Sequence, residues 1–180
     1  MEAAASLFVE KGFDETSIDE IVLLAGSAKG TFYHHYESKQ ALLIALRQRV
    51  AEQYQTDMDA VLAGNQSDDL LERLETWVGA AFDAYINIGP LYEVVYGNYP
   101  ASRWTSADMP FMTDFVALLR EGHQRGIWIV QEPHLTATFI YRGILGAIDD
   151  LILEGKPIAG VKQSMVAVVR HAVGLQSACG

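Results

Sequence analysis

Apolar residues recur every three or four positions through most of this 180-residue chain, and that period predicts amphipathic α-helices. A clear case follows Ser38, where Leu42, Leu46 and Val50 share one face of a helix that Ser38 can cap. We predict about nine helices, over residues 1–12, 17–25, 27–36, 39–62, 68–88, 91–96, 110–124, 133–154 and 160–176. Residues 127–130 could be mistaken for a strand, but without a partner run we interpret them as a buried connection. The predicted fold class is all-α.

The stretch Ser17–Tyr36 predicts two short helices joined by a tight turn. Ser17 and Glu20 fit the S-x-x-E capping box, which places the start of the first helix at Ser17. Gly26 stands where a left-handed residue ends that helix. The second helix, Ser27–Tyr36, has small residues first and aromatic or polar residues after them. This layout is typical of a helix-turn-helix unit, whose second helix enters the major groove of DNA.

The residue types of the second helix suit contacts with DNA. Small residues such as Ser27 and Gly30 allow a close approach to the sugar-phosphate backbone, and Lys29 adds positive charge. The free N–H groups at the helix start also favour a phosphate. Hydrogen bonds to phosphates or base edges can come from Thr31, Tyr33, His34 and His35. The same spacing also fits a short αα-corner that binds nothing, because helix-turn-helix patterns have many false positives.

Together with its flanks, this stretch resembles the DNA-binding domain of the tetracycline-repressor (TetR) family of transcriptional regulators. The resemblance rests on AASLFVEKGFDETSIDEI, which begins at Ala4, and on AGSAKGTFYHHYESKQALL, which begins at Ala25. It covers about a quarter of the chain. The remainder matches the family only in size and helical character.

The chain departs from the family pattern at four places. Ser27-Ala28 puts the hydroxyl one position early, so capping of the second helix can differ. Val22 stands where Ala is usual, and Tyr36 where Phe is common. Met1 lies almost inside the first predicted helix, whereas family members usually carry a basic arm and another helical turn before that point. Either the sequence begins late or this protein lacks the arm.

The resemblance implies a helix-turn-helix domain over residues 1–45 and a helical effector-binding and dimerisation domain over residues 46–180. It also implies a homodimer that binds palindromic operator DNA, responds to a small-molecule effector and acts as a repressor. The residues expected to contact DNA are Thr16, Ser17, Ser27, Lys29, Gly30, Thr31, Tyr33, His34, His35 and Lys39.

Charge argues against strong DNA binding. The chain has 13 Lys and Arg against 23 Asp and Glu, a net charge of −10. Residues 1–45 hold three lysines, Lys11, Lys29 and Lys39, against seven acidic residues, and 3 − 7 gives −4. Phosphate contacts dominate non-specific affinity, so we expect weak, salt-sensitive binding unless a basic arm is present. A local basic surface around Lys29 and Lys39 can nevertheless exist on an acidic protein.

Composition indicates an ordinary globular protein, with 50% hydrophobic and 20% charged residues. No run approaches the roughly 18 apolar residues that span a bilayer, and no secretory leader is recognisable. Because Cys179 is the only cysteine, an internal disulfide is excluded. We expect a cytoplasmic protein without a membrane partner.

Aromatic residues are frequent between residues 77 and 141, which fits either a helical core or an apolar cavity with a few polar groups. Tyr and Trp polar groups need partners when buried, so their number favours a semi-polar cavity. The resemblance favours it too, since the family binds effectors between these helices. The effector-binding candidates are Trp77, Tyr85, Tyr92, Tyr96, Trp104, Phe111, Phe115, Phe139 and Arg142.

The last two predicted helices carry apolar residues on more than one face, and a helix of that kind needs two partners. One partner is the core of the same subunit. The other can be the same helix pair of a second subunit, in a four-helix interface. A fully internal helix pair is the alternative. Gly143, Gly146 and Ala147 would permit close approach. The predicted dimer residues are Ile144, Ile148, Leu151, Val166, Val169 and Val173.

Chemical motifs are largely absent from the sequence, which contains no GxGxxG, Walker-type loop, HExxH, CxxC or GxSxG. His34 and His35 are adjacent and point about 100° apart on a helix, so they cannot share a metal. We therefore expect no cofactor, no metal and no enzymatic activity. The main alternative is a helical small-molecule binding protein that has lost DNA binding. An all-α enzyme is a third possibility, but it needs a convergent set of catalytic groups that the sequence does not offer.

Overall fold

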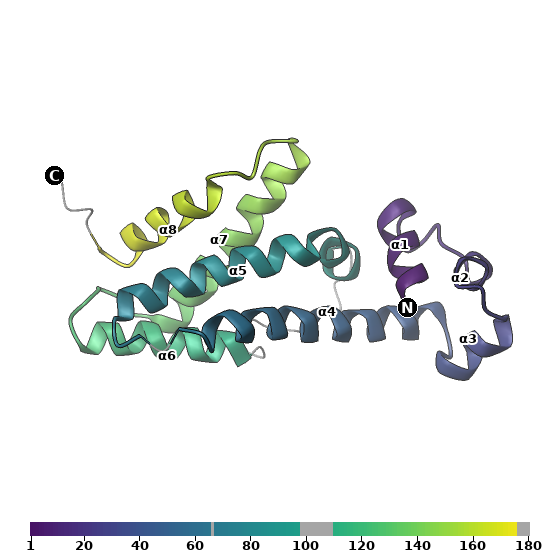
Figure 1. Ribbon diagram of the computed structural model, residues 1–180, viewed down its shortest axis with the longest axis horizontal. Coiled ribbons are helices and arrows are strands. Elements are labelled where there is room, and N and C mark those ends of the chain that lie inside the picture. The colour runs from purple at the N-terminus through teal and green to yellow at the C-terminus, as the bar shows by residue number, and fades with distance from the viewer. Residues whose placement is uncertain (66, 98–109, 176–180) are drawn as a thin grey trace. The chain divides into compact units, whose positions relative to one another are not determined.

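The structure is a computed structural model that describes residues 1–65, 67–97 and 110–175 (Figure 1). These residues form eight α-helices and one π-helical turn, η1, and they form no strand. In chain order the elements are α1 (Glu2–Lys11), α2 (Ile18–Leu24), α3 (Lys29–His35), α4 (Lys39–Leu62), α5 (Leu70–Tyr92), η1 (Glu93–Gly97), α6 (Pro110–Gln124), α7 (Pro133–Leu153) and α8 (Val161–Ala172). The predicted all-α class is confirmed.

The chain divides into two compact units. The first contains α1 to α3, α4 as far as Gln53, and a segment from Ile88 that includes η1. The second contains Tyr54–Asn87 and α6 to α8. α4 is therefore one uninterrupted helix with its first part in one unit and its second part in the other. The domain boundary predicted after residue 45 stays a prediction, since this division falls later along α4.

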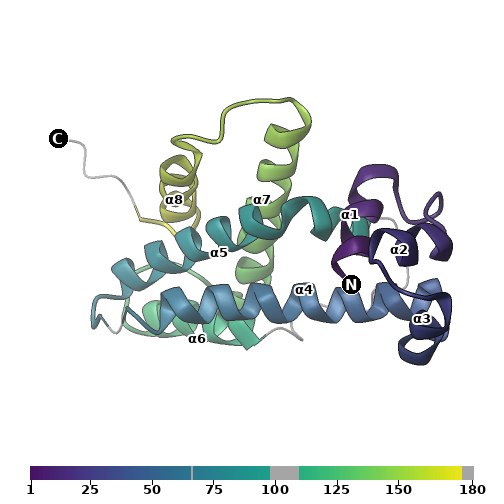
Figure 2. The same cartoon turned by 45° about the vertical axis from the view of Figure 1, so that its right-hand side comes forward.

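Three short helices, α1 to α3, gather around the beginning of α4 (Figure 2). Their core is apolar, and its fully or nearly fully buried side chains are Ala4, Phe8, Ile21, Phe32, Leu42, Leu43 and Leu46. Phe13 closes this core from the loop after α1, with its ring 5.2 Å from that of Phe8 in an edge-to-face contact. Burial of these side chains supplies the main free energy that holds such short helices in place.

Three predicted helix limits are wrong, and one of them is the end of the last helix, which stops at Ala172 instead of residue 176. α3 begins at Lys29 rather than Ser27, because Ala28 has an extended backbone (φ −89°, ψ 150°). α5 does not break at Gly89-Pro90 but continues to Tyr92 and widens into η1. A proline inside a helix removes one N–H from the helical ladder and its ring clashes with the carbonyl four residues before it. The helix nevertheless continues here, and the π-helical turn follows directly. The predicted irregular segment 97–109 lies, from residue 98 onward, outside the described residues.

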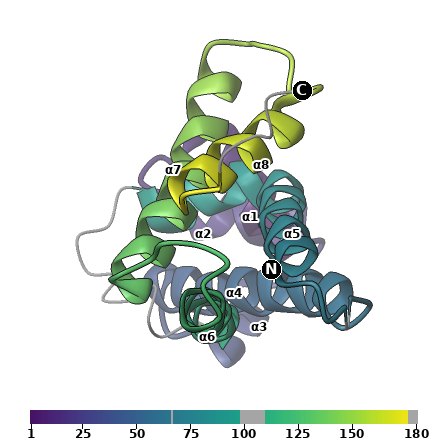
Figure 3. The ribbon, with the colours of Figure 1, turned by 90° about the vertical axis from the view of Figure 1, so that its left-hand side faces the viewer.

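In the second unit, α8 lies against α5 (Figure 3), and two ion pairs join them. Lys162 pairs with Asp83 at 2.5 Å, and Arg170 pairs with Glu75 at 2.7 Å. The connection after α6 is only half-buried, contrary to expectation, because Trp128 is inside while Ile129 is 72% exposed. Among the helices that the structure describes, none has both the length and the apolar character needed to cross a bilayer.

Candidate nucleic-acid interface and effector site

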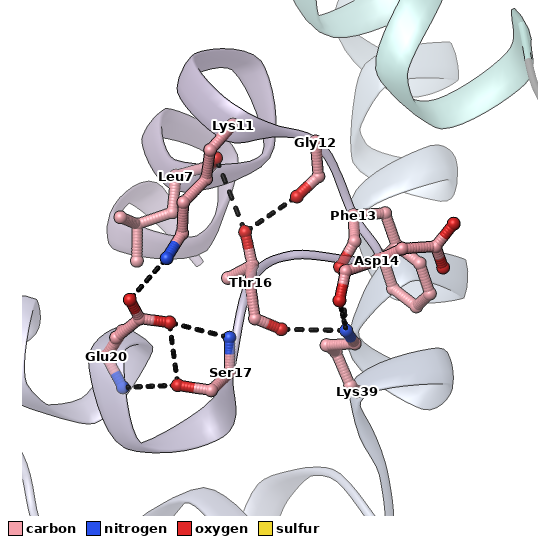
Figure 4. Close-up of polar contacts among 9 residues, drawn as sticks. All are labelled: Leu7, Lys11, Gly12, Phe13, Asp14, Thr16, Ser17, Glu20 and Lys39. Carbon is pink, nitrogen blue, oxygen red and sulfur yellow. Dashed lines mark hydrogen bonds and ion pairs between the residues drawn. The ribbon is translucent and has the colours of Figure 1, made fainter.

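The predicted capping box at the start of α2 is present (Figure 4). The Ser17 backbone N–H donates to Glu20 Oε2 at 2.8 Å, and the Glu20 backbone N–H donates to Ser17 Oγ at 3.2 Å. Lys11 also pairs with the Glu20 carboxylate. Gly26 then has φ 59°, the left-handed conformation that ends α2 and opens the turn. Local sequence therefore fixes the beginning and the end of α2.

The hydrogen bonds to Glu20 have a consequence for acid stability. They lower the pKa of Glu20 from 4.5 to about 2, mainly through Lys11 and then Ser17. Because the folded-state pKa lies below the unfolded one, ionised Glu20 stabilises the fold above pH 4.5, and this contribution is lost as the pH falls toward 2. We expect Glu20→Gln to lower the melting temperature at neutral pH, and the difference from wild type to shrink below pH 4.5.

Circular dichroism melts from pH 7 to pH 3 would measure that difference. Glu10→Gln is the matched control, because Glu10 is exposed on α1 and makes no ion pair with another described residue. A difference between wild type and Glu20→Gln that stays constant across this pH range would contradict the assignment.

Two of the predicted DNA contacts have structural partners instead. The Thr16 side chain is 1% exposed, and its hydroxyl donates to the Gly12 carbonyl at 2.7 Å, so it cannot reach DNA. The Lys39 ammonium donates to three backbone carbonyls, those of Phe13 at 2.7 Å, Asp14 at 3.1 Å and Thr16 at 2.7 Å. All of its donors are used (Figure 4), so Lys39 holds the loop between α1 and α2 rather than a phosphate.

The remaining predicted DNA contacts share one property, which is exposure. They are Ser17, Ser27, Lys29, Gly30, Thr31, Tyr33, His34 and His35. Phe32 alone of α3 is buried and anchors the helix in the core. α3 therefore presents polar and aromatic groups to solvent while a single aromatic side chain fixes its position.

Lys29 is engaged on the surface. Its Nζ lies 2.7 Å from Asp19 Oδ1, and the hydrogen bond and charge of Asp19 raise the pKa of Lys29. Lys11 pairs with Glu20, and Lys39 is used internally, so every lysine of residues 1–45 has an intramolecular partner. The exposed pairs are weak, and a phosphate can displace one of their members.

The effector-binding candidates fall into three groups. Trp77, Tyr85, Phe111 and Phe115 are at most 2% exposed in the second unit, where the rings of Trp77 and Phe115 stack with centroids 3.6 Å apart. Tyr92 and Tyr96 belong to the first unit, and Phe139 is 71% exposed on α7. Arg142 is also exposed, and Trp104 lies outside the described residues. The sequence predicts one aromatic cavity lined by all nine effector candidates, but the candidates that the structure describes do not form a single cavity.

Tyr96 is tied to α4 within the first unit. Its hydroxyl donates to the Arg47 carbonyl at 3.0 Å, and the Arg47 Nε donates to the Val95 carbonyl. Burial and the neighbouring Tyr92 raise the pKa of Tyr96 to about 12, so the phenol stays protonated and remains a donor. These contacts join η1 to α4.

A cavity of about 270 Å³ opens in the second unit between the end of α4, the beginning of α5 and α6. Trp77 is the one effector candidate in its wall. Its polar lining comes from Asn65, Arg73, Thr76 and Asp114, which the sequence analysis did not single out. These four residues follow no common pattern in the sequence, so nothing there indicates that they are neighbours in the fold.

The predicted dimer residues differ in how far they are buried within the subunit. Ile144, Ile148, Val169 and Val173 are at most 5% exposed within the subunit, so their role in a dimer interface stays a prediction. Leu151 and Val166 are half-buried. A helix with apolar residues on two sides does not reveal from sequence which side is internal. No group of His, Cys, Asp and Glu side chains suited to hold a metal occurs among the described residues.

Comparison with known proteins agrees with this geometry. Residues 1–46 match the family described as bacterial regulatory proteins, tetR family. The uncharacterized HTH-type transcriptional regulator YvdT of Bacillus subtilis is 44% identical over 50 residues, which cover 28% of this chain and 26% of YvdT. The HTH-type transcriptional repressor KstR2 of Rhodococcus jostii is 31% identical over 94 residues, covering 52% of this chain and 46% of KstR2. The matches thus span a quarter to less than half of these relatives.

The fold is similar to that of a solved protein described as a transcriptional regulator. The structure of FadR from Bacillus subtilis in complex with stearoyl-CoA superposes with a TM-score of 0.76 at 18% identity, covering 98% of this chain and 97% of FadR. The predicted architecture, a helix-turn-helix domain followed by a larger helical domain, is confirmed, as is the resemblance to the TetR family.

Proposed function

We propose that this chain, whose residues 1–46 match the TetR-family DNA-binding domain, is a ligand-responsive transcriptional repressor that binds palindromic operator DNA as a homodimer. The observation that carries the proposal is α3, held in the core by Phe32 and exposed through Lys29, Thr31 and Tyr33 to His35. Such a helix fits the major groove, and a dimer places two of them about 34 Å apart, one turn of DNA. The protein would act in the cytoplasm.

The effector that we propose is small and largely apolar. The support is the stacked pair of Trp77 and Phe115, the cavity with Trp77 in its wall, and the shared fold with FadR, whose structure contains stearoyl-CoA. α4 connects the unit with the cavity to the unit with α3 without a break. An effector that moves α4 would change the spacing of the two reading helices. By linkage, operator DNA must weaken effector binding by the same factor.

Fluorescence anisotropy of the full chain with labelled DNA from its own upstream region, titrated at several salt concentrations, tests the proposal. We expect a linear fall of log affinity against log salt, because each phosphate contact releases counterions. Absence of binding at low salt would favour the alternative, a helical ligand-binding protein that has lost DNA binding. The specific observation behind that alternative is that all three lysines of residues 1–45 already have partners.

Lys29 and Asp19 give a sharper prediction. Lys29→Ala should weaken DNA binding about tenfold and reduce the salt slope by about one per subunit, because a phosphate contact is lost. Asp19→Asn should strengthen binding by roughly threefold, since a weak, exposed ion pair no longer competes with the phosphate for Lys29. Both are measured in the same anisotropy titration.

Asp14→Asn is the matched control for Asp19→Asn. It makes the same change in net charge, and the Asp14 carboxylate forms no ion pair with another described residue. Equal effects of the two substitutions would show that general charge alone matters. An unchanged salt slope in Lys29→Ala would exclude Lys29 as a phosphate contact.

A further inference from the structure

Two opposite charges, Arg73 of α5 and Asp114 of α6, line the 270 Å³ cavity of the second unit without pairing with each other. Asp114 forms no ion pair with any described residue, and the Arg73 guanidinium makes one contact, from Nη1 to Glu121 Oε2 at 3.4 Å. That contact is the longest ion pair in the described part of the chain. Glu121 also pairs with Arg125 at 3.3 Å, so it keeps a partner when Arg73 turns to a ligand.

The spacing of the two charges follows from α6. Asp114 and Glu121 lie seven positions apart, which is two turns along the same helix face and about 10 Å along the axis. Because Arg73 is held beside Glu121, its guanidinium stands about two turns from Asp114, too far for a direct ion pair. The gap fits one small molecule that accepts hydrogen bonds from Arg73 at one end and donates to Asp114 at the other, each bond about 2.8 Å long.

The rest of the cavity wall is apolar or already hydrogen-bonded. Trp77 adds only ring surface, because its indole N–H donates to the Phe111 carbonyl. Asn65 Nδ2 donates to Thr76 Oγ1, so these two polar side chains satisfy each other. The aliphatic part of the wall is formed by Leu62, Ala117 and Leu118. At about 270 Å³ the cavity is slightly below the usual range of about 300–1,000 Å³, so its occupant is small and has an apolar part.

The two charges restrict the ligand further. A purely apolar molecule would take Arg73 and Asp114 out of water and pair neither of them, which is costly. A carboxylic acid would satisfy Arg73 but bring a second negative charge to Asp114, and an amine would bring a second positive charge to Arg73. A molecule with one group of each sign pairs both side chains.

We propose that this cavity binds a free amino acid with an apolar side chain. The carboxylate of the ligand accepts two hydrogen bonds from Arg73, its ammonium group donates to Asp114, and its side chain lies against Trp77. This assignment rests on the effector response of the proposed function. It keeps the small size and the apolar part of that effector and adds its two charged groups.

Isothermal titration calorimetry of the full chain tests the class of ligand. The probes are L-valine, L-leucine, L-methionine and L-phenylalanine, and we expect at least one of them to bind with a dissociation constant of about 1 mM or lower. Two analogues of the tightest binder each lack one charged group, as isocaproic acid and isoamylamine do for leucine. Both analogues should bind at least about tenfold more weakly than the amino acid, because each loses one charge-assisted contact.

Two variants should change which analogue is tolerated. Arg73→Gln should weaken the amino acid at least about tenfold without weakening the amine. Asp114→Asn should weaken the amino acid by a similar factor and strengthen the carboxylic acid, because Asp114 no longer repels it. Arg120→Gln on α6 and Asp150→Asn on α7 make the same charge changes outside the cavity lining and should leave every affinity unchanged. Circular dichroism of each variant verifies the fold.

Absence of binding by all four amino acids at millimolar concentration would overturn the assignment. Equal affinities of the amino acid and its analogues, or unchanged affinities in both cavity variants, would overturn it as well. The calorimetry uses no DNA, so these results leave the proposed regulator standing, which the anisotropy titration tests by itself. A chain that binds an amino acid in this pattern but binds no operator DNA would overturn the repressor function and support the ligand assignment.

Discussion

Replacing Trp77 with alanine should lower the free energy of unfolding of the second compact unit by about 3–5 kcal/mol, the usual cost of removing a buried aromatic side chain. Trp77 is 2% exposed, stacks on Phe115 with planes 6° apart, and lies within 6.5 Å of Tyr141 between ring centroids. Its ring neighbours Phe111, Phe115 and Tyr141 are rigid and are held on two helices, α6 and α7, so they cannot move in to fill the space that alanine leaves.

Urea denaturation followed by far-ultraviolet circular dichroism measures this loss. Trp77→Phe is the control, because it keeps an aromatic ring for Phe115 and removes only one of the two fused rings, together with the indole N–H that donates to the Phe111 carbonyl at a long 3.4 Å. We expect that variant to lose less than half as much stability. A loss below about 1 kcal/mol in Trp77→Ala would mean that the site collapses easily, which would argue for an adaptable cavity wall rather than a packed core.

This prediction matters for function because Trp77 belongs to both the aromatic cluster and the wall of the 270 Å³ cavity. An effector in that cavity would contact Trp77, a residue on which the packing of α5 and α6 depends. Ligand binding and stability are then coupled, and a ligand that binds only the folded protein raises its melting temperature. Thermal shift in the presence of candidate effectors can therefore find the ligand without knowledge of the operator.

Local signals in the sequence were sufficient to predict both limits of α2. Ser17 and Glu20 predict the start of α2, and Gly26 predicts its end, because caps depend on residues within one or two turns. The same kind of signal failed at Pro90, where packing along α5 outweighs the loss of one N–H and the helix continues. Helix limits thus follow local chemistry except where tertiary packing is stronger.

Side-chain roles that depend on distant partners could not be predicted. Lys39 reads as a candidate phosphate contact in sequence, but its carbonyl partners at Phe13, Asp14 and Thr16 lie more than twenty positions away. The sequence also did not show which side of α7 faces the core. Ile144 and Phe139 are both apolar, and only the packed structure shows that one is internal and the other 71% exposed.

Gly122 carries the second large stability prediction, and Gly122→Ala should lower the free energy of unfolding by about 2 kcal/mol. A Cβ at Gly122 would lie 2.0 Å from the indole of Trp128, far inside van der Waals contact. That indole is 2% exposed and is fixed by a 2.8 Å hydrogen bond from its Nε1 to the Leu119 carbonyl, so it cannot turn aside cheaply. The overlap outweighs the gain of about 1 kcal/mol that alanine normally brings to a helix interior.

A double-mutant cycle with Trp128→Ala separates the steric overlap from the helix-propensity gain of alanine. The free energy of unfolding of each variant is measured in urea. Once the indole is removed, Gly122→Ala should become neutral or stabilising, because only the helix-propensity gain remains. Loss of the same 2 kcal/mol or so in both backgrounds would place the cause elsewhere in α6.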